Sequence, residues 1–310
     1  MSFINSLIIP VYKNADNVPS LIAALQKLQN EIELLEIVFV VDGSPDASAR
    51  LLEEAIPGSK LKARLLVLSR NFGSYQAIRA GMIAARGQFF AVMAADLQEP
   101  PELVVNFFQV LQSERIDLVI AVRESRADPF FSKLASNVFW SLYKRFVMPE
   151  MPKGGVDIFA CNLAFRDHLI RLEESHSSLV ALLFWMGFRR KEISYVRQAR
   201  QVGKSAWTFK KKYNYLKDSV FSFTDIPIKL LKWIGVLGLA FSMLMAAVVL
   251  IGKLTGWVTV QGFSATVLTI IFFGALNLLG LGIIGTYAWR TYENTKRRPT
   301  SIVMFQSDFN

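Results

Sequence analysis

Two aspartates stand directly after apolar runs that have the length of buried strands, and their carboxylates could bind a ligand. Asp96 follows the run 88–93 and precedes Pro100-Pro101, while Asp42 follows the run 35–41. In an open parallel sheet, ligands bind in the crevice outside the carboxyl ends of the strands. We therefore expect both carboxylates at one nucleotide-sized crevice. Either residue could also simply begin a turn, since Asp favours turns and Gly43 follows Asp42.

The elements that would position these carboxylates alternate along the first third of the chain. Apolar runs with strand character are separated by segments with helical spacing, which predicts a Rossmann-like α/β fold, a mostly parallel sheet with helices on both faces. The expected strands are 3–12, 35–41, 64–68, 88–93 and 116–122, and the expected helices are 17–28, 47–55, 74–85 and 102–113. Residues 3–12 lack the basic start and cleavage site of a signal peptide, so we interpret them as the first strand.

A third carboxylate, Asp157, follows the flexible pair Gly154-Gly155, and an apolar segment runs from it to residue 165. Residues 179–196 then predict a helix and a strand. No G-x-G-x-x-G motif follows the first strand, which argues against a dinucleotide-binding dehydrogenase. Gly203-Lys204-Ser205 looks like the end of a P-loop, but Gln198 stands where the first glycine is required. The sequence therefore does not predict an NTPase.

Composition excludes several classes of site and locates the charge. The single Cys161 allows no internal disulfide, and two isolated histidines give no zinc ligand set. The net charge of +10 is concentrated in residues 189–232, which hold 12 basic and 3 acidic residues. Next to apolar segments, such a band indicates anionic lipid before nucleic acid, and no nucleic-acid-binding motif accompanies it.

Two uncharged stretches follow this basic band. Lys232 and Lys253 are separated by 20 residues, and Lys253 and Arg290 by 36. A transmembrane helix needs roughly 20 apolar residues, so we expect two spans near 233–252 and 263–289. Basic residues flank the pair, which predicts a multi-pass protein of the plasma (inner) membrane with its α/β domain and both termini in the cytoplasm. The segment 204–223 predicts an amphipathic helix in the membrane interface, with a buried helix as the alternative.

Five motifs occur in order along the chain: IIPVY at 8–12, VVDGSPD at 40–46, SRNFG at 69–73, DLQEPPE at 96–102 and RQVGKS at 200–205. Together they resemble the successive motifs of family 2 glycosyltransferases, most of all the polyisoprenyl-phosphate branch. That branch includes dolichol-phosphate mannose synthase and the bacterial bactoprenol glucosyltransferases. The resemblance implies a GT-A-like catalytic domain at 1–203, an interfacial segment at 204–230, two transmembrane helices within 231–290 and a cytoplasmic tail at 291–310.

The resemblance also implies an activity, namely inverting transfer of a hexose, with glucose expected, from a UDP-sugar to undecaprenyl phosphate. Asp96 would hold Mg²⁺ or Mn²⁺ on the diphosphate, and Asp157 would act as catalytic base or orient the acceptor. The residues implied for the nucleotide sugar are Pro10, Tyr12, Asp42, Arg70, Asn71 and Gln98. Those implied for the lipid phosphate are Arg123, Arg126, Arg200, Lys204 and Ser205.

One departure from the family pattern leaves alternatives open. Ala94 stands where the family usually has the first of two metal-binding acids. A subunit that binds nucleotide sugar without turnover is therefore one alternative, and a component that transports the glycolipid is another. Small residues in the second span, including Gly274, Gly280 and Gly285, would permit close helix packing, so we also expect a homo-oligomer.

Overall fold

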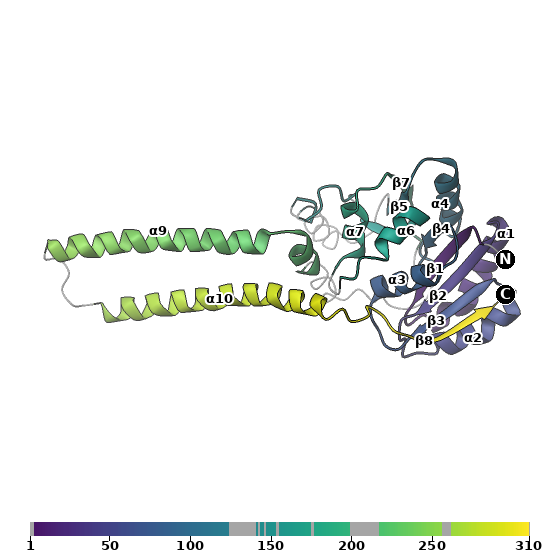
Figure 1. Ribbon diagram of the computed structural model, residues 1–310, viewed down its shortest axis with the longest axis horizontal. Coiled ribbons are helices and arrows are strands. Elements are labelled where there is room, and N and C mark those ends of the chain that lie inside the picture. The colour runs from purple at the N-terminus through teal and green to yellow at the C-terminus, as the bar shows by residue number, and fades with distance from the viewer. Residues whose placement is uncertain are drawn as a thin grey trace.

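Figure 1 shows an α/β domain from which two long helices project side by side. The computed structural model describes residues 3–123, 141, 143–145, 147–152, 155–174, 177–198, 217–255 and 262–309. Within these residues one sheet has the strand order β7-β5-β6-β4-β1-β2-β3-β8. β6 and β8 are antiparallel to their neighbours, and the other strands are mutually parallel. The predicted mostly parallel sheet is therefore confirmed.

The expected alternation of strands and helices is present with small changes at the ends. The strands are β1 (Asn5–Val11), β2 (Leu35–Val41), β3 (Ala63–Leu68), β4 (Phe89–Val92), β5 (Leu118–Arg123), β6 (Val156–Asn162), β7 (Arg190–Tyr195) and β8 (Val303–Phe309). The helices are η1 (Ala15–Asn17), α1 (Val18–Glu31), α2 (Ser48–Ser59), α3 (Ser74–Ala84), α4 (Glu102–Ser113), α6 (Leu163–Leu169), α7 (Leu179–Trp185), α9 (Ile226–Leu254) and α10 (Phe263–Thr295).

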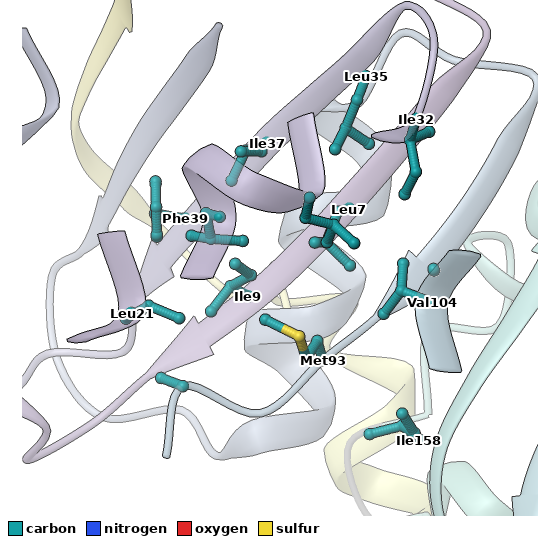
Figure 2. Packing of buried hydrophobic residues seen from close by; sticks show 14 of the residues in the cluster. Leu7, Ile9, Leu21, Ile32, Leu35, Ile37, Phe39, Met93, Val104 and Ile158 are labelled. Carbon is teal, nitrogen blue, oxygen red and sulfur yellow. The ribbon is translucent and has the colours of Figure 1, made fainter. Parts of the chain in front are cut away.

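Two apolar cores lie on the two faces of the sheet. In β1, Leu7 and Ile9 face the core covered by α1, α2 and α4, whereas Ile8 faces the core with α3, α6 and α7. This follows from the period of two along a strand, which sends neighbouring side chains to opposite faces. Figure 2 shows Ile9 beside Phe39 of β2, and the register pairs Leu7 with Ile37. Burial on both faces explains why these strands are continuous apolar runs.

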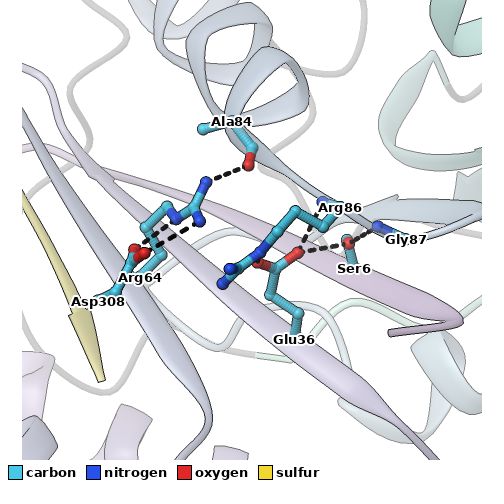
Figure 3. Close-up of polar contacts among 7 residues, drawn as sticks. All are labelled: Ser6, Glu36, Arg64, Ala84, Arg86, Gly87 and Asp308. Atoms are coloured by element: carbon cyan, nitrogen blue, oxygen red, sulfur yellow. Dashed lines mark hydrogen bonds and ion pairs between the residues drawn. The ribbon is translucent and has the colours of Figure 1, made fainter. Parts of the chain in front are cut away.

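The amino-terminal edge of the sheet carries a buried polar network (Figure 3). Glu36 is almost fully buried and accepts hydrogen bonds from the hydroxyl of Ser6 at 3.0 Å and from the backbone N–H and Nε of Arg86 at 2.8 and 2.9 Å. The N–H of Gly87 donates to Ser6 at 2.9 Å. Glu36 of β2 therefore connects β1, through Ser6, with the segment that follows α3, through Arg86. Its role is structural.

The tail beyond the second long helix returns to the sheet, which the sequence analysis did not anticipate. β8 pairs antiparallel with β3 at the edge of the sheet. Arg64 of β3 donates from Nε and Nη2 to the carboxylate of Asp308 at 2.6 and 3.1 Å, and from Nη1 to the carbonyl of Ala84 (Figure 3). The chain thus leaves the α/β domain through α9 and is fastened to it again after α10.

α9 and α10 are long and apolar enough to cross a membrane. The stretches that qualify by length and composition are Ile226–Met245 and Phe272–Thr295, shifted from the expected 233–252 and 263–289. Almost none of either stretch is buried inside the protein, unlike the core helix of a soluble domain. At their domain end, Arg290 donates to Asp218 at 2.6 Å and Tyr287 donates to the carbonyl of Thr224 at 3.5 Å.

Candidate active site

The carboxyl ends of the parallel strands bring the candidate residues to one edge of the sheet. Asp42 follows β2 and Asp96 follows β4, while Arg123 ends β5. β6 runs the opposite way, so its first residues, including Asp157, lie at the same edge. Glu36 lies at the opposite edge, where the parallel strands begin. Asp42 and Asp96 therefore share one edge, as the sequence predicts, and the antiparallel direction of β6 brings Asp157 to the same edge.

Asp42 holds the loop after β3. Its two carboxylate oxygens accept the backbone N–H groups of Phe72 and Gly73 at 2.7 and 2.9 Å, and Asn71 donates from its side chain to the carbonyl of Asp42 at 3.3 Å. Gly43 has a φ of +54°, and a Cβ there would lie 2.1 Å from the carbonyl carbon of Arg70. Only glycine fits this approach. Asp42, Arg70 and Asn71 are thus brought together, although Asp42 is buried and its carboxylate supports the loop.

The end of β1 is joined to the loop after β2. The N–H of Asn14 donates to Ser48 at 3.1 Å, and the N–H of Ala15 donates to Asp46 at 3.1 Å. Burial opposes ionisation of Asp46, but hydrogen bonds from the side chains of Ser44 and Ser48 and from the backbone N–H groups of Ala15 and Ser48 outweigh it and lower its pKa. Pro10 and Tyr12 are half-buried beside this junction. Pro10 lies beyond the residues of β1 that pair with β4, where its missing N–H costs no hydrogen bond on that side.

The loop containing Asp96 is held in an unusual conformation. Leu97 has a φ of +53°, a left-handed conformation that is uncommon for residues other than glycine and is enriched at functional sites. Gln98 accepts a hydrogen bond from Nη2 of Arg197 at 2.7 Å, and its backbone carbonyl accepts the N–H of Gln198 at 2.9 Å. Asp96 is half-buried in this turn. The segment after β7 therefore fixes the loop on which Asp96 lies.

Asp157 forms an ion pair with Arg123 and a hydrogen bond with Tyr195. Arg123 donates from Nε and Nη2 to the two carboxylate oxygens of Asp157, and the hydroxyl of Tyr195 donates to Oδ2 at 2.5 Å. Strand register explains the meeting, because Arg123 lies opposite Tyr195 and Val122 lies opposite Val156. Asp157 and Arg123, which were assigned to separate tasks from the sequence, are therefore direct partners.

This ion pair keeps Asp157 ionised. Burial alone would raise its pKa, but the hydrogen bonds and charge of Arg123, followed by the hydrogen bond of Tyr195, lower it below the usual value. Burial, and then Asp157 itself, raise the pKa of Tyr195, so its hydroxyl stays a donor. A carboxylate held in this way is a weak proton acceptor. In this arrangement Asp157 suits orientation and charge stabilisation better than general-base catalysis.

Glu99 is a member of this cluster that the sequence analysis missed. The residue is 2% exposed, and Oε1 lies 3.8 Å from Nη2 of Arg197. Oε2 has no hydrogen-bond partner among the residues that the structure describes. Burial raises its pKa to about 7; the charge of Arg197 opposes this rise, while Asp157 and Asp96 add to it. The signal in the sequence was the acid that directly precedes Pro100-Pro101, in the same motif as Asp96.

We expect Glu99→Gln to stabilise the protein increasingly as the pH rises. The folded pKa of about 7 exceeds the ordinary 4.5, so ionising Glu99 costs folding free energy between these two pH values. The full cost is about 3 kcal/mol at pH 8. Thermal unfolding in detergent should therefore give equal midpoints at pH 4.5 and a higher midpoint for the variant at pH 8. Glu102→Gln, an exposed neighbour, is the control; a constant difference across pH would contradict the expectation.

The residues near Asp96 fit a divalent cation only when a substrate supplies further ligands. Among the described residues, no three His, Cys, Asp or Glu side chains are grouped as metal ligands. Mg²⁺ commonly binds through one or two carboxylates together with substrate phosphates. Asp96, with Ala94 in place of a second acid, matches that donor set.

Part of the expected acceptor site lies outside the described residues. Arg126, Arg200, Lys204 and Ser205 belong to 124–140 and 199–216, as does most of the expected interfacial helix. Of that helix, residues 217–223 are described and are helical. Gln198, whose N–H donates to the carbonyl of Gln98, is the last described residue before the second of these segments.

Fold and site define an α/β domain with carboxylates and an arginine at the carboxyl-terminal edge of its parallel strands, and comparison with known proteins identifies its family. The sequence profile of glycosyl transferase family 2 matches residues 6–172. The chain belongs to this family, and its sheet is GT-A-like.

Three relatives are similar over nearly the whole chain. YkcC of Bacillus subtilis, a glycosyltransferase, is 32% identical, with 96% of this chain and 92% of that protein covered. The undecaprenyl-phosphate 4-deoxy-4-formamido-L-arabinose transferase of Sodalis glossinidius is 31% identical, with 96% and 92% covered. The bactoprenol glucosyl transferase of Shigella phage SfV is 27% identical, with 96% and 97% covered. These names support polyprenyl-phosphate glycosyl transfer and confirm the resemblance seen in the motifs.

Proposed function

We propose that this protein transfers a hexose, with glucose expected, from a UDP-sugar to undecaprenyl phosphate with inversion. An acceptor phosphate oxygen would attack the anomeric carbon, forming one C–O bond as the bond to UDP breaks. The observation that carries the proposal is that the Asp96 loop and the Arg123–Asp157 pair share one sheet edge in a chain with two membrane-length helices. Relatives of matching length are named for sugar transfer to such lipids.

The donor half of the site would lie over β1, β2 and β4. Pro10, Tyr12 and Asp42, with the loop carrying Arg70 and Asn71, would surround the base and ribose, and Gln98 would lie beside the diphosphate. Asp96 would hold Mg²⁺ or Mn²⁺, which stabilises negative charge on the departing UDP as a Lewis acid. The Arg197–Gln98 hydrogen bond would keep the Asp96 loop in place while the diphosphate binds.

The acceptor half would lie over β5, β6 and β7. Arg123 would receive the lipid phosphate, since a guanidinium fork matches phosphate oxygens, and Arg126, Arg200, Lys204 and Ser205 would complete its site. A phosphate monoester is already largely dianionic at pH 7, so the reaction needs little help from a base. Asp157 would then orient the acceptor or stabilise positive charge that develops on the sugar.

α9 and α10 would cross the plasma membrane and keep the α/β domain on its cytoplasmic face, where the polyprenyl phosphate is embedded. We also propose a homo-oligomer formed through the spans. A Cβ on Gly274, Gly282 or Gly285 would meet none of the described residues within 4 Å, which leaves room for a neighbouring helix, whereas a Cβ on Gly280 would lie 3.2 Å from Leu231 of its own chain.

The proposal predicts that the purified full chain in detergent releases UDP from UDP-glucose only when undecaprenyl phosphate and Mn²⁺ or Mg²⁺ are present. Product mass would identify the polyprenyl-phosphate hexose. UDP-galactose, UDP-N-acetylglucosamine and GDP-mannose, tested in parallel, decide the sugar. Nucleotide binding without release from any donor would contradict the transferase and favour the binding subunit, which Ala94 motivates.

A further inference from the structure

We propose that the acceptor's phosphate and Asp157 compete for the same guanidinium, so that phosphate binding releases Asp157 from Arg123. This inference rests on the proposed function and says how binding of the acceptor's phosphate would change the acceptor site. It concerns an exchange of ion pairs and involves no covalent step.

Asp157 already occupies one hydrogen-bonding edge of the Arg123 guanidinium. Nε and Nη2 form the edge that recognises planar oxygen pairs, and both donate to Asp157. The side chains of Arg123 and Asp157 are only 12% and 15% exposed. A phosphate cannot use this edge of the guanidinium while the carboxylate occupies it. Binding of a phosphate through this edge therefore requires displacement of Asp157.

Displacement from Arg123 would leave Asp157 with other partners that stabilise its charge. The hydroxyl of Tyr195 donates to Oδ2, and the positive charge of Arg197 also favours the ionised carboxylate. A buried charge stripped of all partners would be costly, but this one retains a hydrogen bond and a nearby cation. The incoming phosphate carries more charge than the carboxylate and forms stronger charge-assisted hydrogen bonds with the guanidinium.

The exchange would make the charge of Asp157 depend on whether the acceptor is bound. Before the acceptor arrives, the charge of Asp157 is neutralised by Arg123, so it contributes little to stabilising charge on the donor sugar. After exchange, the carboxylate is released at the moment when the nucleophile is in place. The ion pair would therefore link activation of the site to occupancy by the acceptor.

The test is a binding titration without any nucleotide sugar, using the full chain in detergent at pH 8 and undecaprenyl phosphate as the probe, with inorganic phosphate as a second probe. Competition predicts that Asp157→Asn binds both anions more tightly than wild type, by about tenfold. In the complete assay the same variant should show a lower KM for undecaprenyl phosphate together with a lower kcat. A purely structural role for Asp157 would raise KM.

Two controls separate exchange from a change of net charge. Glu99→Gln removes a nearby negative charge that does not contact Arg123, so exchange predicts a much smaller gain than for Asp157→Asn. Asp117→Asn breaks a similar two-point pair with Arg189 near the amino end of β5, and it should leave phosphate binding unchanged. Adding Arg123→Lys to Asp157→Asn should abolish the gain, because lysine lacks the fork.

Equal or weaker phosphate binding by Asp157→Asn would overturn the exchange. If that variant does not fold, Asp157→Ser, which also removes the charge, carries the same expectation. Tighter binding with no sugar transfer by wild type would support exchange while contradicting the proposed function. Lipid-dependent UDP release by wild type, with no gain in phosphate binding by the variant, would support the proposed function and contradict the exchange.

Discussion

Asp96→Ala is expected to lower lipid-dependent UDP release about 1,000-fold or more. Among the residues proposed to bind the diphosphate, Asp96 supplies the one carboxylate for the cation, since Ala94 replaces the second acid. Stabilisation of a departing diphosphate by a metal is worth several kcal/mol, and about 4 kcal/mol corresponds to a factor of a thousand. Turnover should fall at every Mn²⁺ concentration, whereas thermal unfolding without metal should change little because Asp96 is only half-buried.

A substitution at position 94 should have the opposite effect on the metal requirement. Ala94→Asp would restore the second acid and should lower the Mn²⁺ concentration that gives half-maximal UDP release. Glu102→Gln, an exposed acid six residues after Asp96, is the matched control and should leave turnover and metal requirement unchanged. Turnover by Asp96→Ala within tenfold of wild type would remove Asp96 from the proposed metal site.

Local sequence pattern was sufficient for the main body of the fold. The buried strands β1, β2 and β3 are apolar runs, and the helices between them have one apolar face, so their type and order follow from short-range spacing. β8 could not be found in this way. Its pairing with β3 joins residues 244 positions apart, as in the contact between Arg64 and Asp308, and nothing near residue 303 encodes that partner.

The same distinction applies to the site. Asp42, Asp96 and Asp157 could be selected because each follows a strand or a flexible turn. Their partners could not, since the meeting of Arg123 with Asp157 depends on the antiparallel direction of β6 and on the register of three strands. The ion-pair partner of Glu99 could not be predicted either, since Arg197 is almost a hundred residues further along the chain.

Removing residues 302–310 is expected to destabilise the α/β domain strongly. The truncation deletes β8 and exposes the edge of β3, whose side chains at Leu65 and Leu66 belong to the two cores. It also leaves Arg64, whose side chain is 10% exposed, without the carboxylate of Asp308. Breaking a buried pair costs about 3–5 kcal/mol, and the partial exposure of Asp308 puts this pair at the lower end.

A loss of about 3 kcal/mol in a domain of this size lowers the thermal midpoint by roughly 6–12 °C. Asp308→Asn in the full chain tests the ion pair alone and should produce a smaller decrease, because the strand pairing remains. Glu54→Gln breaks the exposed Arg50–Glu54 pair and should have almost no effect. If the truncated chain unfolds at the wild-type temperature, β8 is an accessory strand; a decrease of the expected size makes the tail after α10 a structural part of the catalytic domain.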